Sequence, residues 1–278
     1  MALTADGVRL AIDRVDPTGP RRAVALCLHA MMTDGRAFAA GRSGGFAATL
    51  AAAGVATYVL DWRGHGRSVP PRAGQDDWSF DDLVELDLPA VLGAVAVDAG
   101  VGPERLAIVG HSLGGLVALA GHGTGVARAG RLVLLSTSVW LPGRGGSRRR
   151  RALMAALAAV TRTVGRAPIR ALRIGPSDEA ASYVAQLTGW ARTGRWTSRR
   201  GVDYLDAVCA ISTPTCGWVG DRDWMCRPRD ADVLLGRVPG AGPARVIAGA
   251  DHFSMLTDRA HARAGGWWGE LAATLVAP

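Results

Sequence analysis

A serine flanked by glycines stands directly after a run of apolar residues near the middle of the chain. The pattern G-x-S-x-G occupies residues 110–114, and the apolar run Leu-Ala-Ile-Val precedes it at residues 106–109. A serine on a sharp turn between a strand and a helix leaves no room for side chains two residues before and after it, and glycine meets that demand. The pattern therefore predicts that Ser112 is a nucleophile held out from the end of a strand.

A serine hydroxyl attacks at neutral pH when a histidine accepts its proton and a carboxylate orients that histidine. Both partners occur further along the chain, each after another short apolar run. Asp221 and Asp223 follow residues 215–219, and His252 follows residues 245–248. We therefore expect His252 to be the general base, with one of the two aspartates hydrogen-bonded to it.

Short runs of β-type residues alternate with helical patterns over most of the chain. Strands are expected at residues 7–15 (a strand or hairpin), 23–28, 55–60, 105–109, 131–135, 215–219 and 245–248. Helices are expected at residues 46–53, 83–97, 113–120 and 260–276, with Pro89 starting, kinking or breaking the second of these. This alternation predicts an α/β fold with a doubly wound, mostly parallel sheet that is covered on both faces.

The alternation stops after residue 135 and resumes near residue 214. The stretch between is rich in Arg and Ala, carries helical patterns and is interrupted by glycine and proline. We therefore expect residues 138–205 to form an inserted helical cap over the carboxyl ends of the strands, with residues 1–137 and 206–278 as the core. Its large aromatic side chains either line an acyl pocket or seal the cap against the core. They are Trp140, Tyr183, Trp190 and Trp196.

The order serine, aspartate, histidine along the chain is that of the α/β-hydrolase triad. A further stretch at residues 61–68, Asp-Trp-Arg-Gly-His-Gly-Arg-Ser, matches the D-x-R-G-x-G-x-S loop common in small-molecule hydrolases of that group. The chain thus resembles the α/β-hydrolase superfamily over almost all of its length except the cap. The cap, with Asp178-Glu179 followed by Tyr183 and Trp190 and with the run at residues 201–204, is similar to caps of bacterial members grouped with serine aminopeptidases and lysophospholipases.

The resemblance implies roles for further residues. Members of the superfamily usually carry the pattern G-x-x-D here. Counted from Gly220, this pattern implies that Asp223 is the acid of the triad and that Asp221 caps the loop. One backbone amide for the developing oxyanion would come from Leu113, directly after the nucleophile. The second would come from Met31, with Met32 as the alternative.

The loop that would supply this second amide departs from the usual pattern. Relatives read His-Gly where this chain has His29 followed by Ala30. Alanine serves there when its backbone avoids positive φ. We expect His29 to brace the loop rather than react.

The resulting prediction is a serine hydrolase that cleaves a small or medium carboxylic ester through an acyl-enzyme on Ser112. Acyltransferase, perhydrolase and aminopeptidase activities on the same triad stay open, as does a noncatalytic ligand-binding role. Haloalkane dehalogenases and most epoxide hydrolases of this superfamily have an aspartate where this chain has Ser112, so both activities are disfavoured. The expected mechanism needs no cofactor. The sequence shows no group of residues with metal-ligand spacing and no phosphate-binding loop motif.

The composition of the chain limits which kinds of partner are expected. The net charge is +8, and all 32 basic residues are arginine, which reflects coding composition rather than a nucleic-acid ligand. The run of arginines at residues 148–151 either opens an amphipathic helix or docks an acidic substrate or partner. No apolar run reaches the roughly 18 residues of a membrane span, and no export signal begins the chain, so a cytoplasmic location and four free cysteines are expected. The expected partner is a small acyl substrate; the oligomeric state is left open.

Overall fold

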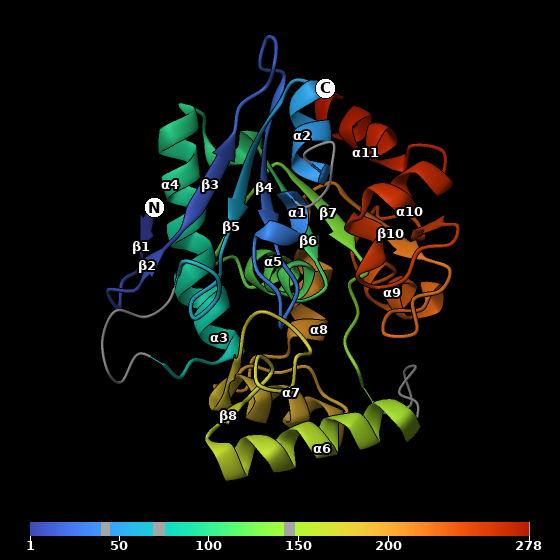
Figure 1. Ribbon diagram of the computed structural model, residues 1–278. Coiled ribbons are helices and arrows are strands. Elements are labelled where there is room, and N and C mark those ends of the chain that lie inside the picture. Colours follow the sequence, from blue (N-terminus) through green and yellow to red (C-terminus); the bar gives the residue numbers. More distant parts are fainter. Residues whose placement is uncertain (40–44, 69–75, 142–147, 278) are drawn as a thin grey trace.

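A sheet of seven strands forms the centre of the molecule in the computed structural model, which describes residues 1–39, 45–68, 76–141 and 148–277 (Figure 1). Its strand order is β11-β10-β7-β6-β4-β5-β3. The strands are β3 (Ile12–Val15), β4 (Ala23–Leu28), β5 (Val55–Leu60), β6 (Leu106–His111), β7 (Arg131–Leu135), β10 (Thr215–Gly220) and β11 (Arg245–Ile247). Neighbours are parallel except β3 and β5, which are antiparallel. The predicted α/β fold with a mostly parallel sheet is confirmed.

Helices cover both faces of this sheet, and the strand residues alternate between them. On one face pack α2 (Gly45–Ala52) and α11 (Trp267–Val276), and on the other α4 (Leu88–Ala99) and α5 (Leu113–Gly123). In β4, Ala25 and Cys27 belong to the apolar cluster on the α2 side, whereas Leu26 and Leu28 belong to the cluster on the α5 side. Successive side chains of a strand point to opposite faces, so a strand covered on both faces reads as an unbroken apolar run.

Two of the predicted helices differ in detail. Residues 260–276 form not one helix but α10 (Asp258–Arg263) and α11, because Gly265 and Gly266 between them have φ values of 71° and 85°. The predicted helix at residues 83–97 begins as a π-helix, η1 (Leu83–Asp87), and continues as α4, with Pro89 in the first turn of α4. The missing N–H of Pro89 thus falls where the hydrogen-bond pattern changes from π-helical to α-helical, and the helix continues through the proline.

The shortest elements carry too few residues for a periodic pattern and were not expected from the sequence. They are strand β1 (Ala2–Leu3), helices α1 (Arg36–Ala39), α3 (Phe80–Asp82) and α8 (Tyr204–Ala207), and the 3-10 turns η2 (Pro103–Arg105), η3 (Val208–Ala210) and η4 (Ser254–Leu256). The strand or hairpin predicted at residues 7–15 is present as two separate strands, β2 (Arg9–Leu10), which pairs with β1, and β3, which pairs with β5. Helix α9 (Pro228–Leu235), although longer, was also not expected.

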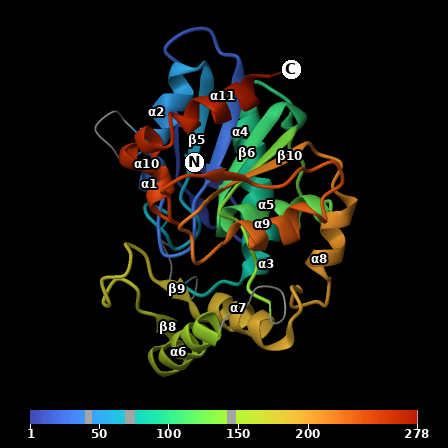
Figure 2. The ribbon, with the colours of Figure 1, turned by 90° about the vertical axis from the view of Figure 1, so that its right-hand side faces the viewer.

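A helical stretch between β7 and β10 lies beyond the sheet, at the bottom of Figures 1 and 2, whereas α8, near its end, packs against α5. It contains α6 (Arg148–Val164), the antiparallel pair β8 (Arg166–Ala167) and β9 (Glu179–Ala180), and α7 (Ala181–Thr193). The expectation of helices alone was wrong in this detail, although the described residues of this stretch add no strand to the central sheet. The division into a core and a cap at residues 138–205 stays a proposal, and residues 142–147 lie outside the described part.

Aromatic side chains seal this stretch against the core. Trp190 and Trp196 are buried and pack with Phe80 and Tyr204 at ring-centroid distances of 4.9–6.2 Å. Tyr183 is buried as well. These rings therefore hold the two parts together, which favours the sealing role over an exposed acyl pocket.

The glycine at position 114 is needed for a close approach of backbones. A Cβ there would lie 2.2 Å from the carbonyl oxygen of Leu28 in β4. We expect Gly114→Ala to lower the free energy of unfolding by about 3 kcal/mol or more, because backbone atoms would have to move. Urea denaturation measures the change.

Gly93 supplies the matched control, since it is exposed within α4 and a Cβ there would meet nothing within 4 Å. Gly93→Ala should raise the free energy of unfolding by about 0.5–1 kcal/mol, the usual gain in a helix interior. Equal effects of the two substitutions would contradict the proposed close approach.

Candidate active site

The turn between β6 and α5 holds Ser112 in a rarely populated backbone conformation. Ser112 has φ 52° and ψ −108°, and its amide donates a 2.8 Å hydrogen bond to the carbonyl oxygen of Leu135 in β7. A Cβ on Gly110 would lie 2.5 Å from the amide nitrogen of Gly115, so the turn closes only with glycine there. Strained residues of this kind persist where the surrounding structure holds them, often at functional sites.

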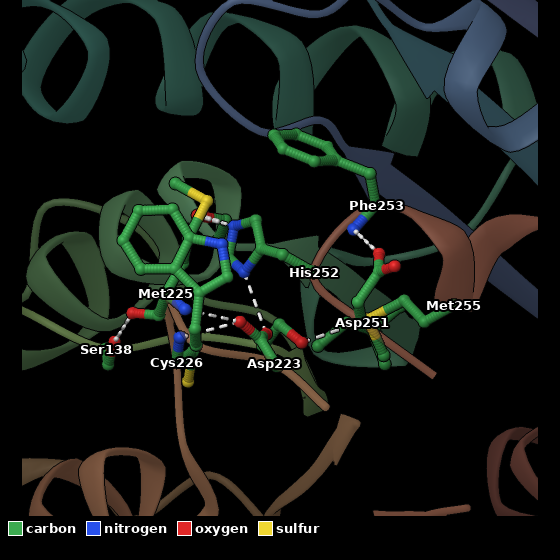
Figure 3. A network of polar contacts seen from close by, with 12 residues as sticks. Ser138, Asp223, Met225, Cys226, Asp251, His252, Phe253 and Met255 are labelled. Carbon is green, nitrogen blue, oxygen red and sulfur yellow. Dashed lines mark hydrogen bonds and ion pairs between the residues drawn. The ribbon is translucent and has the colours of Figure 1, made fainter. Parts of the chain in front are cut away.

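A chain of hydrogen bonds links Ser112 to two side chains from distant loops. Nε2 of His252 lies 3.0 Å from Oγ of Ser112, and Nδ1 of His252 lies 2.8 Å from Oδ2 of Asp223. Figure 3 shows the imidazole of His252 above the carboxylate of Asp223, with Phe253 turned away. The three residues predicted from the sequence are thus brought together, in an arrangement that suits proton transfer from the hydroxyl to the imidazole.

The two aspartates of the β10 loop lie in different surroundings. Asp223 is buried, and its Oδ1 accepts hydrogen bonds from the amides of Met225 (2.8 Å) and Cys226 (2.7 Å). Burial raises the pKa of Asp223, but the hydrogen bond and charge of His252, with the Cys226 amide, more than offset this and lower it. Asp221 is exposed and accepts from the amide of Gly249 at 2.8 Å. The geometry therefore joins Asp223, and not Asp221, to His252.

The candidate oxyanion donors also lie in different environments. The amide of Leu113 opens α5, where the first N–H groups of a helix lack intrahelical acceptors. The amide of Met32 already donates to a carboxylate oxygen of Glu179, which disfavours Met32 as the donor and leaves Met31. Ala30 avoids positive φ, as its replacement of glycine requires, whereas Met32 adopts φ 63°.

Two buried histidines beside the site are held neutral. Burial lowers the pKa of His29 and of His111 to about 3 in each case. Nε2 of His111 donates a 2.8 Å hydrogen bond to the carbonyl oxygen of His252 and so supports the loop that carries the base. Nε2 of His29 accepts from the amide of Trp62 at 3.1 Å, which matches the expected bracing role.

The loop at residues 61–68 is braced by its own polar groups. Arg63 is buried and pairs with Asp87 at 2.6 Å and with Asp6 at 2.8 Å. Asp61 accepts hydrogen bonds from the amides of Gly35 (2.7 Å) and Arg67 (2.9 Å). The motif that carries the resemblance therefore shapes the loop beside the site.

The arginine run at residues 148–151 anchors α6 to the loop of the acid. Arg150 is buried, pairs with Asp230 at 2.6 Å and donates to the carbonyl oxygen of Trp224 at 2.6 Å. Arg149 stacks over the Trp224 ring at 4.4 Å. The run therefore opens helix α6, as the first of its two interpretations expected, with Arg149 and Arg151 exposed and Arg150 buried against the loop that follows β10.

Two further expectations concerned the cysteines and membrane-spanning segments. Cys27, Cys209, Cys216 and Cys226 are free. Within the described residues, no helix is long and apolar enough to cross a membrane.

Sequence reasoning assigned no role in the site to Glu179 of β9, a buried carboxylate near the site. It is 1% exposed, and one of its oxygens contacts both the Met32 amide and the ring of His65. The cap pattern in which Glu179 stands indicates a likeness to other proteins but no contact between this carboxylate and the Met32 amide. Nδ1 of His65 lies 2.9 Å from the carbonyl oxygen of Arg63.

Comparison with known proteins identifies a family and a fold for this chain. A family model described as serine aminopeptidase, S33, matches residues 21–258. A monoacylglycerol lipase of Mycolicibacterium smegmatis is 37% identical over 114 residues, which are 41% of this chain and 37% of that protein. The aligned part therefore spans little more than a third of that relative.

Solved structures share the whole fold at low identity. The monoacylglycerol lipase of Paleococcus ferrophilus matches with a TM-score of 0.64 and 17% identity, over 96% of this chain and 98% of its own. An esterase from Exiguobacterium antarcticum matches with a TM-score of 0.66 and 16% identity, over 100% of both chains. Likeness at this identity establishes the α/β-hydrolase fold.

Proposed function

The chain belongs to the serine aminopeptidase S33 family of α/β hydrolases, and we propose that it is a serine hydrolase that cleaves small or medium carboxylic esters through an acyl-enzyme on Ser112. The observation that carries the proposal is the hydrogen-bond chain from Ser112 through His252 to the buried Asp223. All three residues follow strands of the parallel sheet, at the edge where doubly wound folds bind ligands.

In the proposed mechanism, Oγ of Ser112 attacks the acyl carbonyl while Nε2 of His252 takes the hydroxyl proton. The lowered pKa of Asp223 keeps its carboxylate ionised, so it stabilises the imidazolium and fixes its orientation. The amides of Met31 and Leu113 donate to the oxyanion of the tetrahedral intermediate. His252 then protonates the departing alcohol, and a water activated by the same imidazole releases the acid.

Ester chemistry is favoured over peptide chemistry by the likeness to a monoacylglycerol lipase that is 37% identical over 114 residues. We therefore expect monoacylglycerols and simple aryl esters to be substrates. An aminopeptidase activity, which the family description names, is the second candidate.

A substrate panel separates these possibilities. Purified protein is labelled with a fluorophosphonate probe and assayed with p-nitrophenyl esters from acetyl to palmitoyl, a monoacylglycerol and aminoacyl p-nitroanilides. Labelling with turnover of the esters is the expected result, and faster turnover of the anilides would establish the aminopeptidase instead. Transfer of the acyl group to added alcohols would identify an acyltransferase. A folded protein that reacts with none of them would refute the proposal and leave a binding role.

A further inference from the structure

A short segment of the predicted cap, residues 175–179, packs against the turn that carries the Met31 amide. A Cβ on Gly175 would lie 2.2 Å from the carbonyl oxygen of Met32, so this segment packs directly against the turn. Oε1 of Glu179 accepts a hydrogen bond from the Met32 amide. The hydroxyl of Tyr183 lies 3.9 Å from Sδ of Met31. The segment thus contacts Met32, and Tyr183 of the following helix α7 contacts Met31.

The Met32 backbone needs such support. Its φ of 63° lies in the left-handed region, which a side chain with a Cβ disfavours. The hydrogen bond from its amide to Glu179 opposes relaxation toward an ordinary conformation. Any such relaxation would rotate the neighbouring peptide planes and move the Met31 amide away from the oxyanion.

The carboxylate of Glu179 is held in an environment that is costly for a charge. Its side chain is fully buried, and within the described residues Oε2 has no hydrogen-bond partner. Burying a carboxylate costs free energy unless it is paired, so a residue needed only to fill space would be apolar. The pairing comes from the ring of His65.

The geometry around His65 shows how the charge is balanced. Its Nδ1 lies 2.9 Å from the carbonyl oxygen of Arg63, and its Nε2 lies 3.3 Å from Oε1 of Glu179. A neutral imidazole donates from one nitrogen only, so two acceptors imply a proton shared between His65 and Glu179. Burial lowers the pKa of His65, but the charge and hydrogen bond of Glu179, together with the Arg63 carbonyl oxygen and the charge of Asp61, outweigh this and raise it.

We propose that Glu179 is a positioning residue of the active site, which holds the Met31–Met32 turn from the cap so that the Met31 amide faces the oxyanion. This inference rests on the proposed function. It assigns to the cap a part in stabilising the transition state, in addition to any contact with substrate.

Three variants test the inference. Glu179→Ala removes the acceptor, and Glu179→Leu removes it while filling the volume with apolar atoms, which keeps the cap packed if the alanine variant fails to fold. Glu179→Gln retains an oxygen that can accept from the Met32 amide. The control is Asp81→Ala, because Asp81 is also buried and ties α3 to the cap through Gln186 and Tyr204, without contacting the turn.

The readouts are kcat and KM for p-nitrophenyl acetate and the inhibition constant Ki of a trifluoromethyl ketone, which forms an oxyanion on the serine. We expect Glu179→Ala and Glu179→Leu to lower kcat about 100-fold with little change in KM, since a displaced donor costs about that much. Ki should rise by the same factor. Glu179→Gln should stay within about fivefold of wild type, because its amide oxygen still accepts the hydrogen bond.

The control separates positioning from general loosening of the cap. Asp81→Ala should lower the melting temperature while kcat and Ki stay within about threefold of wild type, because it does not touch the turn. An equal loss of kcat in Asp81→Ala, or unchanged kcat and Ki in both Glu179→Ala and Glu179→Leu, would overturn the inference alone. A wild type that neither hydrolyses the ester nor binds the ketone would overturn the proposed function and the inference with it.

Discussion

Ser112→Ala is expected to abolish ester hydrolysis, with kcat falling by about 10⁴-fold to 10⁶-fold, because no other group can form the acyl-enzyme. The only side-chain contact of the hydroxyl in the described structure is the 3.0 Å hydrogen bond to Nε2 of His252. Alanine has the same backbone requirements as serine at this turn, so the fold should survive. Circular dichroism and urea denaturation would check that it does.

The measurement combines fluorophosphonate labelling with hydrolysis of p-nitrophenyl butyrate. Both signals should vanish in Ser112→Ala and persist in Ser138→Ala. Ser138 is a suitable control because it lies beside the same loop, where its hydroxyl donates to the carbonyl oxygen of Met225, and it does not contact His252 (Figure 3). Labelling that survives in Ser112→Ala would place the nucleophile elsewhere and refute the assignment.

The second large effect is expected at the acid. Asp223→Asn should lower kcat by about 10⁴-fold, as loss of the acid does in such triads, because the amide would present N–H to Nδ1 of His252. The histidine would then carry its proton on Nε2, facing Ser112, and could no longer accept the hydroxyl proton. The asparagine oxygen can still accept from the amides of Met225 and Cys226, so the loop should keep its shape.

Asp221→Asn is the matched control, two residues away in the same loop. Asp221 is exposed and contacts the Gly249 amide, so kcat should stay within about threefold of wild type. The two variants are compared by kcat and by the rate of fluorophosphonate labelling. A large loss in Asp221→Asn with a small one in Asp223→Asn would exchange the roles of the two aspartates.

Much of the fold was predictable because its signals are local. Strands β4, β5 and β7 begin and end at the residues predicted from their apolar runs, since a strand buried on both faces needs an unbroken run of this kind. Elements of two to four residues carry too little pattern to be recognised. The break between α10 and α11 depends on the positive φ of two adjacent glycines, a combination that helical composition alone does not reveal.

The sequence by itself determined which chemical groups are available and which strands, in order along the chain, precede them. Ser112 and His252 stand at recognisable turns after apolar runs, and in parallel strands such turns collect at one edge of the sheet. For that reason the sequence could identify three residues that the folded chain joins by hydrogen bonds.

Only the tertiary structure decided how those groups are supported. The bond from Met32 to Glu179 joins residues 147 positions apart, and the pair of Arg150 and Asp230 joins residues 80 positions apart. Burial distinguishes Asp223 from Asp221, although both stand in the same loop. Such contacts depend on the meeting of surfaces in space and on the exclusion of water, and no local pattern of residues encodes either.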